Sequence, residues 1–120
     1  MKDWIVKPLL VDFDGVLHGY PKHRKYGFEL SDPIVPGAAK FINEVSKEFE
    51  VSIYSARSVT SFGQSMMKEY LLRKNVDISK LHWPTFKPAA WMTIDDRCIC
   101  FNGKFPSVEE LINFKAWYEK

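Results

Sequence analysis

The alternation of apolar and polar segments along the chain predicts strands that take turns with helices. Short apolar runs, which are typical of buried strands, occur at four places: residues 9–11, 51–54, 81–86 and 91–94. Between the first two runs, apolar side chains recur at three- and four-residue spacing over residues 38–49, which predicts an amphipathic helix. This order favours an α/β fold with a mostly parallel sheet.

Two more helices are expected further along the chain. One covers residues 59–74, with Ser58 as its N-cap and with an apolar face built from Phe62, Met66, Tyr70 and Leu71. The other starts near Ser107, where Ser-Val-Glu-Glu has the spacing of a capping box, and continues to the C-terminus. The turn signal at residues 102–103, Asn-Gly, predicts a hairpin over residues 98–105, and a short hairpin arm is expected over 27–30.

Length and composition agree with one folded domain. The chain has 120 residues, 46% of them hydrophobic and 27% charged, and it contains neither repeats nor linkers, so residues 1–120 are interpreted as a single domain. A net charge of +2 is too small to indicate nucleic acid or an anionic membrane as a partner. Four consecutive basic residues, 22–25, are interpreted as a solvated turn or as an electrostatic lip for an anionic substrate.

The two cysteines and the N-terminal segment indicate a cytoplasmic protein. Cys98 and Cys100 are only two residues apart, a spacing that suits neither a zinc site nor a local disulfide. We therefore expect core or near-core thiols and a reducing compartment. Neither a secretory signal nor a membrane span is recognisable in the sequence.

Reactive side chains follow three of the predicted strands. Asp12 and Asp14 come after the first strand, Ser55 after the second, and Asp95 with Asp96 after the strand over residues 91–94. Ligands of open parallel sheets lie beyond the carboxyl ends of the strands. The sequence therefore predicts one crevice that gathers these side chains, together with Lys87. Two carboxylates at the end of a buried strand need a cation, a proton or a substrate.

This order of residues resembles the haloacid dehalogenase-like (HAD) phosphohydrolases over nearly the whole chain. The first motif is Val-Asp-Phe-Asp-Gly-Val-Leu at residues 11–17, with Val16 where the family often has threonine. The second ends at Ser55, the third is Lys87 with Lys80 as a competing candidate, and the fourth ends in Asp95 and Asp96. The resemblance implies a three-layer α/β/α, Rossmann-like open sheet. The connecting segments 19–36 and 57–91 are too short for a separate cap domain.

The resemblance also implies a magnesium-dependent phosphomonoester hydrolase. Asp12 would be the nucleophile that forms an aspartyl-phosphate, and Asp14 the general acid and base, a role helped by a pKa raised by neighbouring carboxylates. Mg²⁺ would be bound by Asp12, the Asp14 main-chain carbonyl and Asp96, with the roles of Asp95 and Asp96 exchangeable. Ser55 and Lys87 would contact the phosphoryl group.

Three further side chains are weaker candidates. Arg57 and Arg97 would contact the substrate phosphate, since a guanidinium matches phosphate geometry, or would form surface ion pairs. His18, just past the first motif, is interpreted as incidental or as a hydrogen-bonding partner of the substrate.

The expected partner is a phosphorylated small molecule, phosphoprotein or nucleic-acid end. Without a cap domain the site would be open, and an oligomer in which a second copy covers it is a further possibility. Two other interpretations remain. One is a HAD-like binding module without catalysis. The other is a phospho-acceptor domain of the response-regulator type, which has its acidic residues in a different order.

Overall fold

A small open parallel sheet carries the candidate residues. The computed structural model of the chain describes residues 6–19, 30 and 32–120. Within that part there are three strands, β1 (Pro8–Val11), β2 (Glu50–Ile53) and β3 (Met92–Ile94), all parallel and in the order β2-β1-β3. Val11 is in register with Ile53 on one side and with Ile94 on the other, so the strands finish at one level. The predicted parallel α/β sheet is confirmed.

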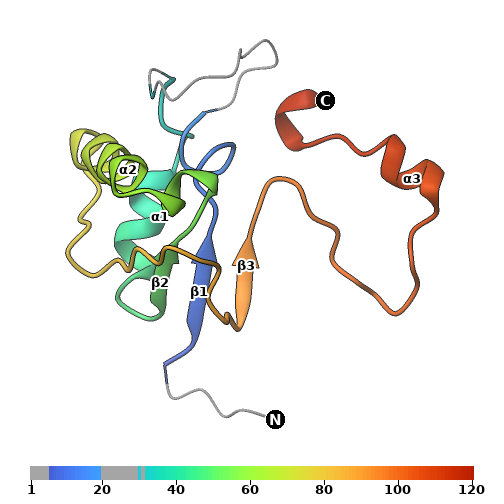
Figure 1. Cartoon of the computed structure of the whole chain (residues 1–120), viewed down its shortest axis with the longest axis horizontal. Helices are drawn as coiled ribbons and strands as arrows, with labels where there is room; N and C mark the ends of the chain where they lie inside the picture. The colour runs from blue at the N-terminus through green and yellow to red at the C-terminus, as the bar shows by residue number, and fades with distance from the viewer. Residues whose placement is uncertain (1–5, 20–29, 31) are drawn as a thin grey trace.

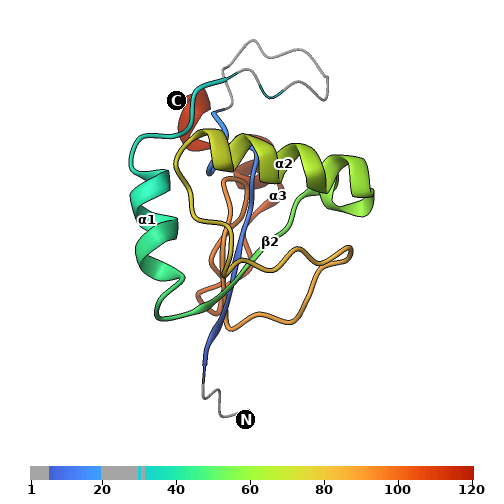
Figure 2. The same ribbon diagram turned by 90° about the vertical axis from the view of Figure 1, so that its left-hand side faces the viewer.

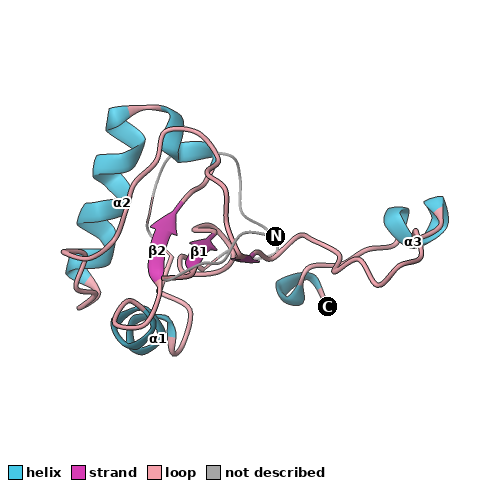
Figure 3. Cartoon of the chain, turned by 90° about the horizontal axis from the view of Figure 1, so that it is seen from below, coloured by secondary structure: helices cyan, strands magenta, loops and turns pink. Residues whose placement is uncertain are grey.

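Two helices pack on this sheet and close the core. β2 lies between α1 (Ala38–Val45) and α2 (Ser61–Arg73), as Figure 3 shows, and α2 runs across the strands near their carboxyl ends (Figure 2). One cluster of buried side chains joins the central strand to both helices and includes Leu9, Val11, Ile42, Met67 and Leu71. Burying side chains of this size contributes about 1.5–3 kcal/mol each, so this cluster is what fixes the strand ends in place.

Both helices are shorter than the sequence pattern predicts. The pattern over residues 38–49 continues past the end of α1 at Val45, because residues 46–49 form a turn instead. The N-cap of α2 is Thr60, whose side chain accepts from Gly63 N, and not Ser58. Ser58 is fully buried, and its Oγ accepts from Ser55 N over 3.0 Å. Phe62, expected on the apolar face, is 65% exposed.

The expected strand over residues 81–86 is reduced to one isolated parallel bridge, between Ser52 and His82. Leu81 is buried beside it, but Pro84, two residues after His82, has no N–H to donate to a ladder. The basic residues 22–25 and most of the expected hairpin arm, 27–29, lie outside the described residues.

Beyond β3 the chain leaves the sheet as a long arm (Figure 1). The arm contains α3 (Val108–Ile112) and a 3₁₀ turn, η2 (Trp117–Glu119). The predicted capping box is confirmed, since Ser107 Oγ accepts from Glu110 N over 3.1 Å. The continuous helix to the C-terminus was wrong, because α3 ends at Ile112.

The hairpin predicted over residues 98–105 was also wrong, since no strand forms there. Instead, Asn102 Oδ1 accepts from Lys104 N over 3.1 Å, a local bond that competes with strand pairing. Cys98 and Cys100 are both exposed free thiols, which contradicts their interpretation as core residues. The arm exposes many other apolar side chains, among them Ile99, Phe101, Phe105, Leu111 and Ile112. None of the described helices is long and apolar enough to cross a membrane.

Candidate functional site

Main-chain hydrogen bonds hold the three strand ends together. Asp12 N donates to Ile94 O over 3.0 Å, which joins the end of β1 to the end of β3. Tyr54 N donates to Val11 O over 3.1 Å, which joins β2 to β1 from the other side. The residues that follow each strand, at 12, 55 and 95, are therefore brought to one edge of the sheet.

A hollow of about 200 Å³ lies at this edge. Its lining contains a carboxylate from each of two strand ends, a hydroxyl and an ammonium group: Asp12, Asp95, Ser55 and Lys87. Leu10, Tyr54, Ala56 and Thr93 complete it. Lys80, the competing candidate for the third motif, does not line this hollow; its charge acts on the neighbouring Asp77.

Three carboxylates meet beside the hollow. Asp12, Asp95 and Asp96 each offer an oxygen, and these oxygens lie within 4.8 Å of one another. Burial, a side-chain hydrogen bond with Asp96 and the charges of Asp95 and Asp96 raise the pKa of Asp12 to about 8, although Phe13 N–H opposes them. At neutral pH the cluster therefore holds a proton that a cation would replace. Oxygen-only ligands suit a hard divalent ion.

Asp14 does not join this cluster, contrary to the prediction. Arg57 Nε donates to Asp14 Oδ2 over 2.8 Å, and His18 Nδ1 lies 2.9 Å from Asp14 Oδ1. Burial raises the pKa of Asp14, but the hydrogen bonds and charges of His18 and Arg57 outweigh it and hold that pKa below the usual value. The raised pKa expected from neighbouring carboxylates was wrong.

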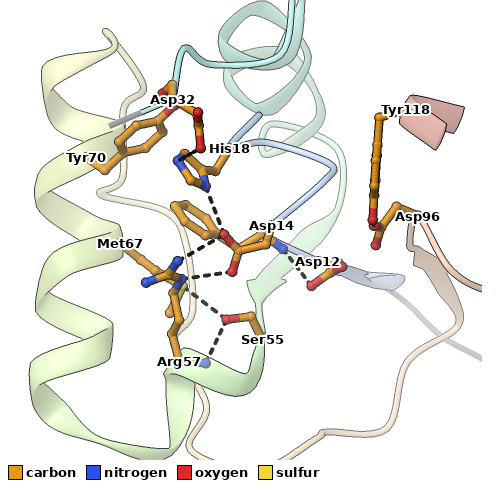
Figure 4. A network of polar contacts seen from close by, with 11 residues as sticks. Asp12, Asp14, His18, Asp32, Ser55, Arg57, Met67, Tyr70, Asp96 and Tyr118 are labelled. Atoms are coloured by element: carbon orange, nitrogen blue, oxygen red, sulfur yellow. Dashed lines mark hydrogen bonds and ion pairs between the residues drawn. The ribbon is translucent and has the colours of Figure 1, made fainter. Parts of the chain in front are cut away.

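The two aspartates diverge because β1 ends at Val11. Residues two apart point the same way only while the chain stays extended, and here Phe13 N already turns back to donate to Asp12 Oδ1 over 2.8 Å. Figure 4 shows Asp14 directed to Arg57 and His18, whereas Asp12 lies on the side of Asp96. Alternation along a strand therefore overestimated how many carboxylates share one site.

His18 has a larger structural role than a lone loop histidine usually has. It is fully buried, and its Nε2 lies 3.5 Å from Asp32 Oδ2 while its Nδ1 faces Asp14. Its ring stacks on Phe13 and meets Tyr70 edge-on. The sequence signal available was its position four residues after Asp14, within reach of a tight turn.

Ser55 is held with its hydroxyl at the hollow. It is 7% exposed and caps the 3₁₀ turn η1 (Ala56–Val59), where its Oγ accepts from Arg57 N over 3.0 Å. Its own proton is directed to Met67 Sδ at 3.5 Å. Since a thioether is a weak acceptor, an anionic oxygen in the hollow would be a stronger partner for this donor.

The two candidate arginines have different surroundings. Arg57 is largely buried against Asp14, so it reaches the site as a partner of an acid. Arg97 is exposed, and its guanidinium bonds to Glu119 Oε1 over 2.8 Å and to Tyr118 Oη over 3.4 Å. Their predicted contacts with a substrate phosphate stay predictions.

The C-terminal turn also reaches the site, which the sequence pattern did not indicate. Tyr118 Oη donates to Asp96 Oδ2 over 2.7 Å, and Trp117 Nε1 donates to Gly15 O over 2.7 Å. Burial and the bond to Asp96 raise the pKa of Tyr118 to about 12, so the phenol stays protonated as a donor.

Comparisons with protein-family models, with curated proteins and with solved structures each found no match for this chain. What the fold and the site define is a small parallel α/β protein with an acidic cluster and a polar hollow at its strand ends.

Proposed function

We propose that the protein is a magnesium-dependent phosphomonoester hydrolase that works through an aspartyl-phosphate on Asp12. The observation that carries the proposal is the hollow at the strand ends, where Asp12, Ser55 and Lys87 lie together with Asp95. The motif order that resembles the HAD phosphohydrolases supports it, and so does the parallel sheet. The finer description, a three-layer Rossmann-like domain without a separate cap, belongs to this proposal.

The carboxylates can bind a cation, and one of them can also act as the nucleophile. Asp12, Asp95 and Asp96 would hold Mg²⁺, with the Asp14 main-chain carbonyl as a further oxygen ligand. A bound Mg²⁺ supplies positive charge that lets an anionic carboxylate and an anionic phosphate approach each other. It would also remove the proton that burial and neighbouring acids keep on Asp12.

The reaction then has two displacements at phosphorus. In the first, an Asp12 oxygen bonds to phosphorus, the bond to the alcohol oxygen breaks, and Asp14 gives that oxygen a proton. In the second, Asp14 takes a proton from water, the water oxygen bonds to phosphorus, and the bond to Asp12 breaks. Lys87 and the Ser55 hydroxyl offset the charge on the phosphoryl oxygens in both steps.

The Asp14 contacts constrain its double role. With its pKa lowered by His18 and Arg57, Asp14 is ionised at neutral pH and ready for the base step. For the acid step it needs a proton, so its bond to Arg57 must weaken when substrate enters. Arg57 would then be available to the phosphate or the leaving group, which joins the two roles expected for that residue.

Hydrolysis of an aryl phosphate tests the proposal. We expect Mg²⁺-dependent turnover by the wild type and none by Asp12→Asn, whereas Asp77→Asn, at an exposed carboxylate that does not line the hollow, retains activity. A phosphoenzyme should accumulate in Asp14→Asn and not in Asp12→Asn. Full activity of Asp12→Asn contradicts the nucleophile assignment. Absence of turnover on sugar phosphates, nucleotides, phosphopeptides and 3′-phosphorylated oligonucleotides favours the binding module without catalysis.

A further inference from the structure

The last turn of the described chain packs against the first motif. Trp117 and Gly15 are 102 positions apart, yet the indole N–H of Trp117 donates to Gly15 O over 2.7 Å. That carbonyl belongs to the loop that follows Asp12 and Asp14. The bond therefore fixes the main chain directly after the proposed nucleophile and the proposed acid.

The next residue, Tyr118, bonds to a carboxylate of the acidic cluster. Tyr118 Oη donates to Asp96 Oδ2 over 2.7 Å, and Figure 4 shows the ring beside that carboxylate. A carboxylate can use its other lone pairs for a cation while it accepts this bond. Donors behind a metal-binding carboxylate set its orientation and tune its basicity.

Close packing at Gly15 joins these two contacts into one unit. A Cβ on Gly15 would lie 2.3 Å from Asp96 Oδ2 and 3.0 Å from Tyr118 Cε1. Asp96 and the Tyr118 ring therefore both pack directly on the Gly15 backbone. The position of Asp96 relative to the first loop is set by this contact and by the Tyr118 hydroxyl together.

The turn itself is held on both sides. Glu119 Oε1 accepts from Ala116 N over 3.0 Å and from Arg97 Nη2 over 2.8 Å. Ala116 is 1% exposed, although its neighbours in the arm are largely exposed. Arg97 directly follows Asp96, so the segment that carries Asp95 and Asp96 also bonds to the turn through Glu119.

We propose that Trp117 and Tyr118 are positioning residues of the site, with Trp117 holding the loop after β1 and Tyr118 holding the Asp96 carboxylate beside Asp12 and Asp95. This inference rests on the proposed function, because it takes Asp96 as a ligand of the cation. Both side chains act through other groups of the site, Gly15 O and Asp96 Oδ2. Their effect is therefore expected first in metal affinity.

Binding of Mn²⁺ to the full chain, followed by loss of the paramagnetic resonance signal of the free ion, tests this role without substrate. Tyr118→Phe keeps the ring and removes only the hydroxyl, and we expect it to raise the dissociation constant about 10-fold or more. The Mg²⁺ concentration for half-maximal hydrolysis should rise in parallel, while kcat at saturating Mg²⁺ changes less. Trp117→Phe is the second variant. It should also weaken Mn²⁺ binding, because the loop after β1 loses the hydrogen bond from the indole N–H.

Two matched variants serve as controls. Tyr70→Phe loses a hydroxyl that donates to Asp32 O, and Trp91→Phe changes a tryptophan that stacks on Phe49. Both should bind Mn²⁺ like the wild type. The inference is overturned if Tyr118→Phe and Trp117→Phe bind Mn²⁺ as tightly as these controls. If the protein also hydrolyses phosphomonoesters, the proposed function stands. Weakened Mn²⁺ binding by Tyr118→Phe in a protein that hydrolyses no phosphomonoester overturns the proposed function and retains the positioning role.

Discussion

Arg57 and Asp14 form a two-bond ion pair across the candidate site. Nε of Arg57 donates to Asp14 Oδ2 over 2.8 Å and Nη2 donates to Asp14 Oδ1 over 3.2 Å. The Arg57 side chain is 8% exposed and that of Asp14 24%, so the pair is shielded from water far more than an ordinary surface pair.

Arg57→Gln should therefore destabilise the fold by about 1–3 kcal/mol at neutral pH, the cost of leaving a partly buried acid without its partner. The pKa of Asp14 is lowered in the folded protein, so its stabilising effect is present above the ordinary pKa of 3.8 and is lost as the pH falls through the folded value. The difference in unfolding free energy between variant and wild type should therefore shrink at acidic pH. Urea unfolding at neutral and at acidic pH measures this difference.

Arg73→Gln is the matched control for that pair. Arg73 bonds to Glu69 on the exposed face of α2, where both side chains are more than half exposed, and little change in unfolding free energy is expected. Equal losses for the two variants would contradict the stabilising role of the Asp14 pair.

The raised pKa of Asp12 predicts an opposite pH dependence for the metal-free protein. Because the folded state binds a proton that the unfolded state releases above pH 3.8, stability should fall as the pH rises toward about 8. A loss of about 1 kcal/mol would lower the melting temperature by roughly 4–8 °C. Thermal unfolding in the presence of a chelator, over this pH range, measures the effect.

Asp12→Asn should flatten this pH dependence, since the amide does not titrate. Added Mg²⁺ should stabilise the wild type most at the alkaline end, where the carboxylates are ionised. A melting temperature of the metal-free wild type that stays constant or rises toward pH 8 would be incompatible with a proton held on Asp12.

Gly15→Ala should be more damaging than its backbone angle alone explains. Gly15 has φ +84°, a conformation that costs an L-residue about 1–2 kcal/mol, and the added methyl group would also collide with Asp96 Oδ2. Gly37 has nearly the same angle, φ +87°, with nothing within 4 Å of the added atom. Gly37→Ala should therefore show the backbone cost only, and Gly15→Ala should in addition weaken Mn²⁺ binding. Equal effects on Mn²⁺ binding would refute the packing argument.

Lys87 and Lys80 can be separated by activity. Lys87→Ala removes the ammonium group that lines the hollow and should lower kcat/KM for an aryl phosphate by about 100-fold or more. Lys80→Ala, at an exposed lysine beside Asp77, should leave kcat/KM unchanged. The reverse result would transfer the third-motif role to Lys80. Because both lysines are exposed, melting temperatures should hardly move.

The sheet and its strand ends were predictable because they depend on local pattern. Apolar runs give the strands, and parallel pairing brings the residues at 12, 55 and 95 to one edge. The partition of the aspartates was not predictable in the same way. It depends on the residue at which β1 stops, and on a buried histidine and arginine whose contacts come from tertiary packing.

The region after β3 was predicted least well. Its apolar runs and its Asn-Gly turn favour a hairpin, but strand propensity needs a neighbouring strand and a packed face. Among the described residues none pairs with this segment, and local bonds such as Asn102 to Lys104 prevail. The contact of Trp117 with Gly15 spans 102 positions and that of Tyr118 with Asp96 spans 22, so no short-range pattern encodes them.

Because the arm buries little surface, the contacts that it makes with the site can open while the core stays folded. α3 contains no buried residue, whereas the sheet and α2 share the buried core. Segments with so little buried surface open with a small fraction of the free energy of global unfolding. Amide exchange should therefore be fast along the arm and slow in β1. Asp96 would then lose its hydrogen bond from Tyr118 many times for each time the sheet unfolds. The fraction of time that the turn is docked would set the fraction of molecules with a complete proposed metal site, while the core remains intact.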